Sequence, residues 1–201
     1  MDEGAKDGGF GKKTGIDLHG EASGLIASPA YKQKVFKEDW FLGDTFNAAI
    51  GQGFTLVTPI QIAQMLSAVA TDGKRYKPHL VTKIINDDGS VVKTFDPELE
   101  GPLPVSKENL DLVQEGLKAV TKEGGTASSL DSLPVSVAGK TGTAENPHGR
   151  DHGWFIAYAP SEKPKYVVVC IVEQGSFGSV SAAPIVKNIL EYLFANENKK
   201  G

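Results

Sequence analysis

The chain has 201 residues, of which 40% are hydrophobic and 23% are charged, and its formal net charge is -4. This composition is typical of a globular protein, and the acidic balance argues against a nucleic-acid partner or an anionic membrane surface. The longest apolar run, "YVVVCIV" at 166–172, is much shorter than the roughly 20 residues that cross a bilayer, and no targeting pattern is visible at the N-terminus.

The chain begins with a glycine-rich stretch. Residues 1–50 alternate small turn residues with single apolar ones, so we expect an irregular loop region packed on a larger body. A strong helix signal follows: Thr58 is the expected N-cap, Pro59 occupies the first helical position, and Gln61 completes a capping box. Gly73 is the expected end of this helix.

Two more helices are predicted from apolar residues at helical spacing. One begins after a Ser106 cap and ends at Gly124 and Gly125, and the other covers 182–195. The apolar positions that define them are Leu110, Val113, Leu117 and Val120 in the first, and Ile185, Val186, Ile189, Leu190 and Leu193 in the second.

Strand signals occupy the remaining segments. Two β-branched runs flank Asp88-Gly89 and predict a hairpin, and three later strands are expected in "VSVAGKTGTA", "HGWFIAYAP" and "KYVVVCIVE". The predicted fold class is therefore α+β, an antiparallel sheet with helices packed on its faces. Its expected parts are the loop region at 1–50, a helical part with the hairpin at 51–135, and three strands with the C-terminal helix at 136–201.

The tripeptide Lys-Thr-Gly occurs twice, at 13–15 and at 140–142. The first copy follows several glycines, so a turn explains it. The second lies in a predicted strand, where Lys140 and Gly142 share one face and Thr141 and Thr143 the other. If this strand borders a cleft, the glycine admits a ligand backbone, and the lysine and threonines can meet an anionic substrate. The backbone N–H beyond the glycine can then stabilise an oxyanion.

Simpler explanations compete with this one. A strand lysine is usually solvated, so the tripeptide alone carries little weight. A phosphate-binding loop would need glycine where Pro134 stands, and Gly11-Lys12-Lys13 lacks the required Ser or Thr. His148 and His152 are too few ligands for a metal site, so no metal is expected.

The residues as a set resemble a known family. "GKTGTAE", "GKKTGIDLHGEASGLI", "GWFIAYAP" and above all "NAAIGQGFTLVTPIQIAQMLSAVATDGKRYKPHLV" are similar to the C-terminal half of the transpeptidase domain of penicillin-binding proteins. The likeness extends from Phe10 to Phe194 and is strongest to the elongation-type class B enzymes. It implies a penicillin-binding, β-lactamase-like transpeptidase fold without its N-terminal strands and nucleophile helix.

The resemblance also implies a reaction. A serine attacks the D-Ala-D-Ala bond of a peptidoglycan stem peptide, forms an acyl-enzyme and passes the acyl group to an amine of a neighbouring strand, and β-lactams trap the acyl state. By this analogy, which rests on the K-T-G motif, Lys140 provides positive charge. Thr141 and Thr143 bind the substrate carboxylate beside Gly142, and the Thr143 N–H belongs to the oxyanion hole.

Two family motifs are missing. Ser90 and Lys93 match S-x-x-K formally, but on a strand positions three apart face opposite sides, so we reject that pair. No S-x-N occurs in the sequence. We therefore expect a fragment that is inactive alone and whose partner is the N-terminal part of the same domain. The last strand would pair with an absent first strand, and its apolar edge is expected to favour self-association.

Three functional interpretations remain open from the sequence. The first is a peptidoglycan transpeptidase, with stem peptides, β-lactams and cell-wall elongation proteins as partners, no cofactor, and a location at the cell membrane on its extracytoplasmic face. The second is a β-lactamase or β-lactam sensor. The third is a non-catalytic binding module, if the gene starts at Met1.

Overall fold

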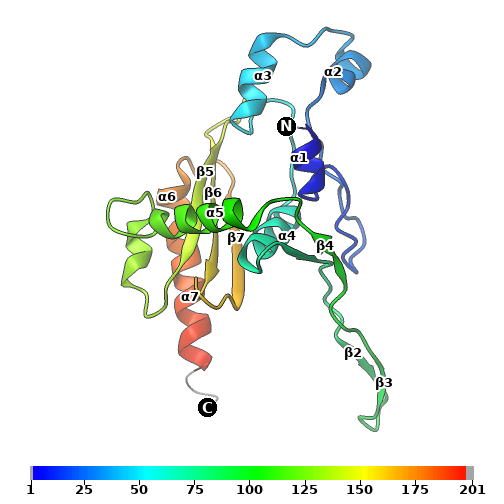
Figure 1. Ribbon diagram of the computed structural model, residues 1–201, viewed down its shortest axis with the longest axis vertical. Coiled ribbons are helices and arrows are strands. Elements are labelled where there is room, and N and C mark those ends of the chain that lie inside the picture. The colour runs from blue at the N-terminus through cyan, green and yellow to red at the C-terminus, as the bar shows by residue number, and fades with distance from the viewer. Residues whose placement is uncertain (1, 198–201) are drawn as a thin grey trace. The chain divides into compact units, whose positions relative to one another are not determined.

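The computed structural model describes residues 2–197. The chain divides into two compact units, Met1–Ala68 with Lys74–Pro104, and Val69–Gly73 with Val105–Gly201 (Figure 1). The boundary after Pro104 separates the predicted hairpin from the second predicted helix, so it divides the expected helical part at 51–135. The two units are described in turn.

The first unit contains helices that the sequence analysis missed. Residues 1–50 are not an irregular region throughout, because α1 (Asp2–Asp7), α2 (Pro29–Phe36) and α3 (Leu42–Ala49) lie within them. Each has at most eight residues, and such short helices are unstable alone, so propensity gives them little signal. The segment between α1 and α2 is irregular apart from one bridge, as expected.

Tertiary contacts stabilise α2 and α3. Ser28 caps α2 by accepting a hydrogen bond from Tyr31 N at 3.2 Å. Lys32 is only 4% exposed, and its Nζ donates to Asp44 Oδ2 of α3 at 2.7 Å. The same carboxylate oxygen accepts from Phe41 N at 2.8 Å, so Asp44 caps α3 while holding α2 against it.

Helix α4 (Pro59–Ala70) begins where the sequence places it. The capping box is present in both directions: Thr58 N donates to Gln61 Oε1 at 2.9 Å, and Gln61 N donates to Thr58 Oγ1 at 3.3 Å. Gln61 does more than cap. Its side-chain amide is buried and donates to the carbonyl oxygens of Lys12 and Ser23, which ties the preceding loop to the helix.

Four short strands complete the first unit. β1 (Lys74–Tyr76) pairs antiparallel with β4 (Leu99–Pro102), a pairing that the sequence analysis did not anticipate. β2 (Lys83–Ile85) and β3 (Val91–Thr94) form the predicted hairpin around the Asp88-Gly89 turn. Every residue of β2 and β3 is exposed, so this hairpin is not part of the hydrophobic core.

The second unit contains the expected sheet. β5 (Ala138–Ala144), β6 (His152–Ala159) and β7 (Tyr166–Val172) form an antiparallel sheet in the order β5-β6-β7. This confirms the three predicted strands and the α+β class. Among the described residues β7 pairs only with β6, so one edge of β7 is unfilled.

Within its described residues the same unit contains three helices and one 3-10 turn: α5 (Lys107–Val120), η1 (Ser128–Ser132), α6 (Gly178–Ser181) and α7 (Ala183–Glu197). α5 starts at its predicted cap, where Ser106 Oγ accepts from Asn109 N at 3.3 Å. The inner face of α7 is Val186, Leu190 and Phe194, whereas the expected Ile185 and Ile189 are exposed. Apolar spacing alone did not distinguish these two adjacent faces.

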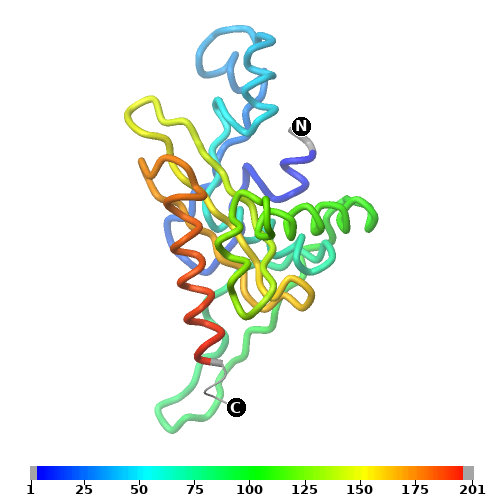
Figure 2. Tube along the Cα trace, turned by 90° about the vertical axis from the view of Figure 1, so that its left-hand side faces the viewer, coloured from blue at the N-terminus to red at the C-terminus, as the bar shows by residue number. Residues whose placement is uncertain are grey.

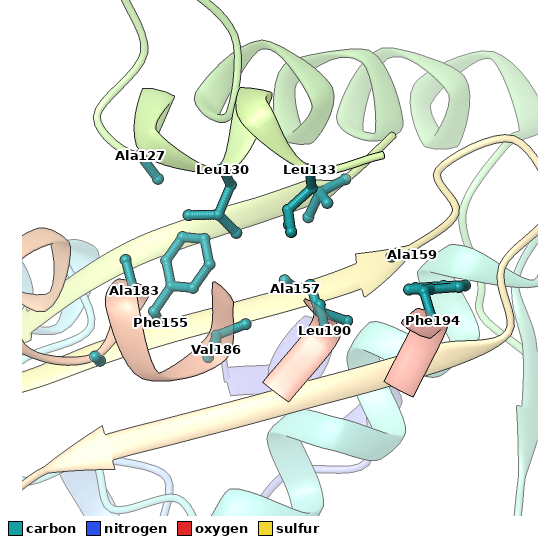
Figure 3. Close-up of a cluster of buried hydrophobic side chains, with 12 residues drawn as sticks. Ala127, Leu130, Leu133, Phe155, Ala157, Ala159, Ala183, Val186, Leu190 and Phe194 are labelled. Atoms are coloured by element: carbon teal, nitrogen blue, oxygen red, sulfur yellow. The ribbon is translucent and has the colours of Figure 1, made fainter. Parts of the chain in front are cut away.

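One hydrophobic core joins these elements. Phe155 of β6 is 0% exposed, and Figure 3 shows its ring between Leu130 of η1 and Val186 of α7. Alternate residues of β6 face this core, so the opposite face of the strand carries Trp154 and Ile156. The full buried cluster is Ala127, Leu130, Leu133, Val137, Phe155, Ala157, Ala159, Ala182, Ala183, Val186, Leu190 and Phe194.

Candidate functional site

The second Lys-Thr-Gly copy lies on β5 in an unbroken ladder with β6. Lys140 pairs with Ile156, Thr141 with Phe155, Gly142 with Trp154 and Thr143 with Gly153. The strand is buried where it starts, at Ala138 and Gly139, and becomes exposed or half-buried from residue 140 onward. The segment 140–143 is therefore a surface rim of the sheet and is not enclosed in the core.

The regular register fixes which way each side chain of the rim points. Thr141 pairs with the core-facing Phe155, so it lies on the face that α7 covers, and its Oγ1 lies 3.0 Å from Thr126 Oγ1. Lys140 lies on the opposite face, and its Nζ donates to the Thr141 carbonyl at 2.6 Å. Thr126, between α5 and η1, is a neighbour of the motif that the sequence analysis missed.

Gly142 is constrained from within the sheet. A Cβ atom built on it would lie 3.2 Å from Trp154 Cβ on the next strand, tighter than ordinary van der Waals contact. A side chain at 142 would therefore press on the Trp154 side chain as well as narrow any cleft above the strand. Only the second of these reasons for a glycine can be inferred from the sequence.

The first Lys-Thr-Gly copy forms a turn closed by a carboxylate, which agrees with its interpretation as structural. Glu21 Oε1 accepts hydrogen bonds from Thr14 N and Thr14 Oγ1, both at 2.6 Å, and Glu21 Oε2 accepts from Gly15 N at 3.1 Å. Thr14 is 3% exposed, and Gly15 has a φ of 77°, which favours glycine. The threonine hydroxyl is thus directed at the protein's own carboxylate.

This turn predicts a dependence of stability on pH. Burial alone would raise the pKa of the Glu21 carboxyl, but the three bonds from Thr14 and Gly15 outweigh it, and the pKa falls below its ordinary value of 4.5. The stabilisation is therefore complete above pH 4.5 and is lost as the pH falls through the lower, folded-state pKa. We expect Glu21→Gln to reduce the urea midpoint at pH 7 and to flatten its decline between pH 5 and about pH 3. Glu191→Gln, at an exposed carboxyl on α7, is the control, and an unchanged pH profile in Glu21→Gln would contradict the interpretation.

The formal S-x-x-K match lies in the tip and second strand of the β2–β3 hairpin. Ser90 belongs to the turn, where its Oγ donates to Asp88 Oδ1 at 2.6 Å, and the Lys93 ammonium lies 4.5 Å from the centre of the Phe95 ring. Each group has a local structural partner. The structure thus gives no support for a nucleophile and base at this pair, which agrees with its rejection.

His152, at the start of the neighbouring strand, has a structural neighbour as well. His152 opens β6 opposite Ala144, and its Nδ1 accepts a hydrogen bond from Gln174 N at 3.0 Å. Within residues 2–197 no group of three or more His, Cys, Asp or Glu side chains is arranged to hold a metal ion. In the same residues no helix has the length and apolar character to span a bilayer.

Comparison with known proteins places this sheet and rim in one family. The sequence profile described as "Penicillin binding protein transpeptidase domain" matches residues 1–191. The peptidoglycan D,D-transpeptidase MrdA of Salmonella typhimurium is 33% identical over 208 residues, which cover 92% of this chain and 33% of the relative. The chain belongs to the penicillin-binding protein transpeptidase family, and its class B MrdA relatives confirm the resemblance inferred from the sequence.

Solved structures support the same assignment. PBP2 of Pseudomonas aeruginosa, crystallised in complex with WCK 5153, is 37% identical to this chain and superposes on it with a TM-score of 0.79. The match covers 94% of this chain and 42% of the PBP2 chain. PBP2 of Helicobacter pylori, in a complex with MreC, is 35% identical with a TM-score of 0.75, and the match covers 94% of this chain and 34% of that one. The chain spans about a third of the length of the curated relatives it matches.

Proposed function

We propose that this chain forms one wall of the active site of a peptidoglycan D,D-transpeptidase. The observation that carries the proposal is the exposed K-T-G rim of β5 in a chain that belongs to this family over residues 1–191. The curated relatives are named for this activity. The motif occurs twice in the sequence, and only the copy at 140–142 has its polar groups on an exposed strand.

The four rim residues have different proposed roles. Lys140 supplies positive charge on the face opposite α7, where it lowers the energy of an anionic substrate and of the developing oxyanion. Thr141 and Thr143 lie on the other face of β5, and their hydroxyl groups donate to the carboxylate of a stem peptide or of a β-lactam that binds across the outer edge of the strand, where both faces can be reached. Gly142 keeps the strand open to the substrate backbone, and the Thr143 N–H is a donor of the oxyanion hole.

The proposed reaction needs a serine that this sequence does not supply in a recognisable S-x-x-K setting. Its hydroxyl oxygen adds to the D-Ala-D-Ala carbonyl carbon, and the terminal D-alanine leaves with the proton. An amine of a second strand then attacks the ester carbon, the new amide bond forms as the ester C–O bond breaks, and the serine oxygen takes up the proton of the amine. The rim stabilises the oxyanion in both steps. We therefore infer that this chain alone is inactive and that the upstream part of the domain completes the site.

The proposal extends to partners and location. Peptidoglycan lies outside the cytoplasmic membrane, so the site acts on the extracytoplasmic side. The solved complex of a relative with MreC makes a cell-wall elongation protein the expected class of partner. The unfilled edge of β7 can add a strand from the upstream part of the domain or from a second copy of the chain, which concentration-dependent sedimentation of the isolated chain would reveal.

Covalent labelling by a fluorescent penicillin tests the function. We compare this chain alone with the full gene product that contains it, and expect a labelled band only from the full product. Absence of label on the full product would refute the transpeptidase proposal. A label on the isolated chain would refute the inference that the nucleophilic serine lies in the upstream part of the domain. Rapid loss of the label with turnover of the drug would favour a β-lactamase instead.

A further inference from the structure

The single turn of helix α6 packs against the backbone behind the K-T-G rim. A Cβ atom built on Gly178, the first residue of α6, would lie 2.0 Å from the Trp154 carbonyl oxygen and 2.5 Å from the Gly142 carbonyl oxygen. Both obstructing atoms are backbone, one on β6 and one within the motif itself. Figure 2 shows α6, in orange, beside these two yellow strands.

A second glycine completes the contact from the side of the sheet. A Cβ atom on Gly153, the ladder partner of Thr143, would lie 2.2 Å from Ser181 Oγ, 3.0 Å from Ser176 O and 3.2 Å from Gly178 Cα. The backbone of α6 therefore rests directly on the backbone of β5 and β6 at residues 142 and 153. We call this contact between Gly142, Gly153 and Gly178 the glycine seat.

The α6 side of the seat is firmly anchored. Ser176 N donates to Asp151 O at 2.9 Å, and Ser181 N and Ser181 Oγ both donate to Phe177 O at 3.1 Å. Immediately after α6, Ala182 and Ala183 are 0% exposed in the hydrophobic core. A side chain added in the seat therefore forces α6 and the two strands apart, which changes the position of the backbone at residues 142 and 153.

We propose that Gly178 is a positioning residue for the transpeptidase site, an inference that rests on the proposed function. It touches no substrate. It lets α6 support the strand from behind, and this sets the height of Gly142 and the direction of the Thr143 N–H. Donation to an oxyanion depends steeply on distance and angle, and a Cβ atom so close to two backbone oxygens forces the backbone to shift, so Gly178→Ala is expected to slow acylation without removing any functional group.

The test is Gly178→Ala in the full gene product, with Gly116→Ala as matched control, because a Cβ atom on Gly116 of α5 meets nothing within 4 Å. The fraction of protein labelled by excess fluorescent penicillin measures folded sites, and the second-order rate constant of labelling measures their geometry. We expect Gly178→Ala to lower the rate constant at least about tenfold in the fraction that labels, and Gly116→Ala to change neither quantity.

A second pair of variants remains informative if Gly178→Ala does not fold. Gly153→Ala is expected to slow labelling, and adding Ser181→Ala, which removes the closest obstructing atom, is expected to restore part of the rate. If a smaller fraction of a variant is labelled by penicillin but the rate constant stays at the wild-type value, or if no variant is labelled at all, the seat is only structural. Either result would overturn the proposal. A wild-type protein that does not label would instead refute the proposed function.

Discussion

Replacement of Lys140 by alanine is expected to lower the rate constant of penicillin acylation of the full gene product by about 100- to 1,000-fold, the usual cost of losing a donor aimed at a developing oxyanion. Lys140 is exposed on the rim, and its Nζ donates to the Thr141 carbonyl on the surface of the strand. The hydrophobic core is untouched, so the free energy of unfolding should change by no more than about 0.5 kcal/mol. Labelling reactions that are quenched at successive times and resolved on gels give the rate constant of acylation.

Two variants sharpen this experiment. Lys163→Ala removes an exposed lysine from the turn between β6 and β7 and should leave acylation unchanged. Lys140→Arg keeps the charge but changes the shape of the donor, so partial activity is expected. If Lys140→Ala is acylated at the wild-type rate, the assignment of the rim as the anion-binding wall is wrong.

Replacement of Phe155 by alanine is expected to reduce the free energy of unfolding by about 3–5 kcal/mol. The ring is fully buried among Leu130, Ala183 and Val186, and a Cβ atom on Gly139 of β5 would lie 2.9 Å from its Cζ atom. Its loss leaves a cavity beneath the strand pair that carries the motif. The acylation rate of the folded fraction should fall as well, because Phe155 lies opposite Thr141.

Urea denaturation measures the stability change, and Tyr192→Ala is the control because that ring is 70% exposed on α7, in the same unit as Phe155. The control should change the unfolding free energy by less than about 0.5 kcal/mol. A comparable loss of stability in both variants would mean that the cluster around Phe155 is not the dominant core of its unit.

The elements that the sequence predicted well are those with local signals. Thr58, Pro59 and Gln61 specify the start of α4 within four positions of the chain, and the structure has both hydrogen bonds of that box. The Asp88-Gly89 turn likewise determines its hairpin. The rim could be singled out from the sequence because a lysine, threonines and glycines interrupt an otherwise apolar strand.

The elements that were missed depend on contacts between distant residues. α2 and α3 are joined through buried Lys32 and Asp44, which are twelve positions apart. β1 and β4 pair across the whole intervening hairpin, so neither segment shows its partner locally. Gly178 stands in a glycine-containing stretch like many others, and only the coordinates show it lying against the Gly142 carbonyl.

The β2–β3 hairpin offers a practical handle on the protein. All of its strand residues are exposed, the turn is closed by Asp88 Oδ1 accepting from Ser90 N at 2.8 Å, and Gly89 has open space around it. Exposed tips of this kind tolerate inserted peptides because no packed side chain depends on them. A short epitope or a dye-accepting tag inserted at this tip would open the turn but contact no packed side chain, so it would label the protein without disturbing the hydrophobic core.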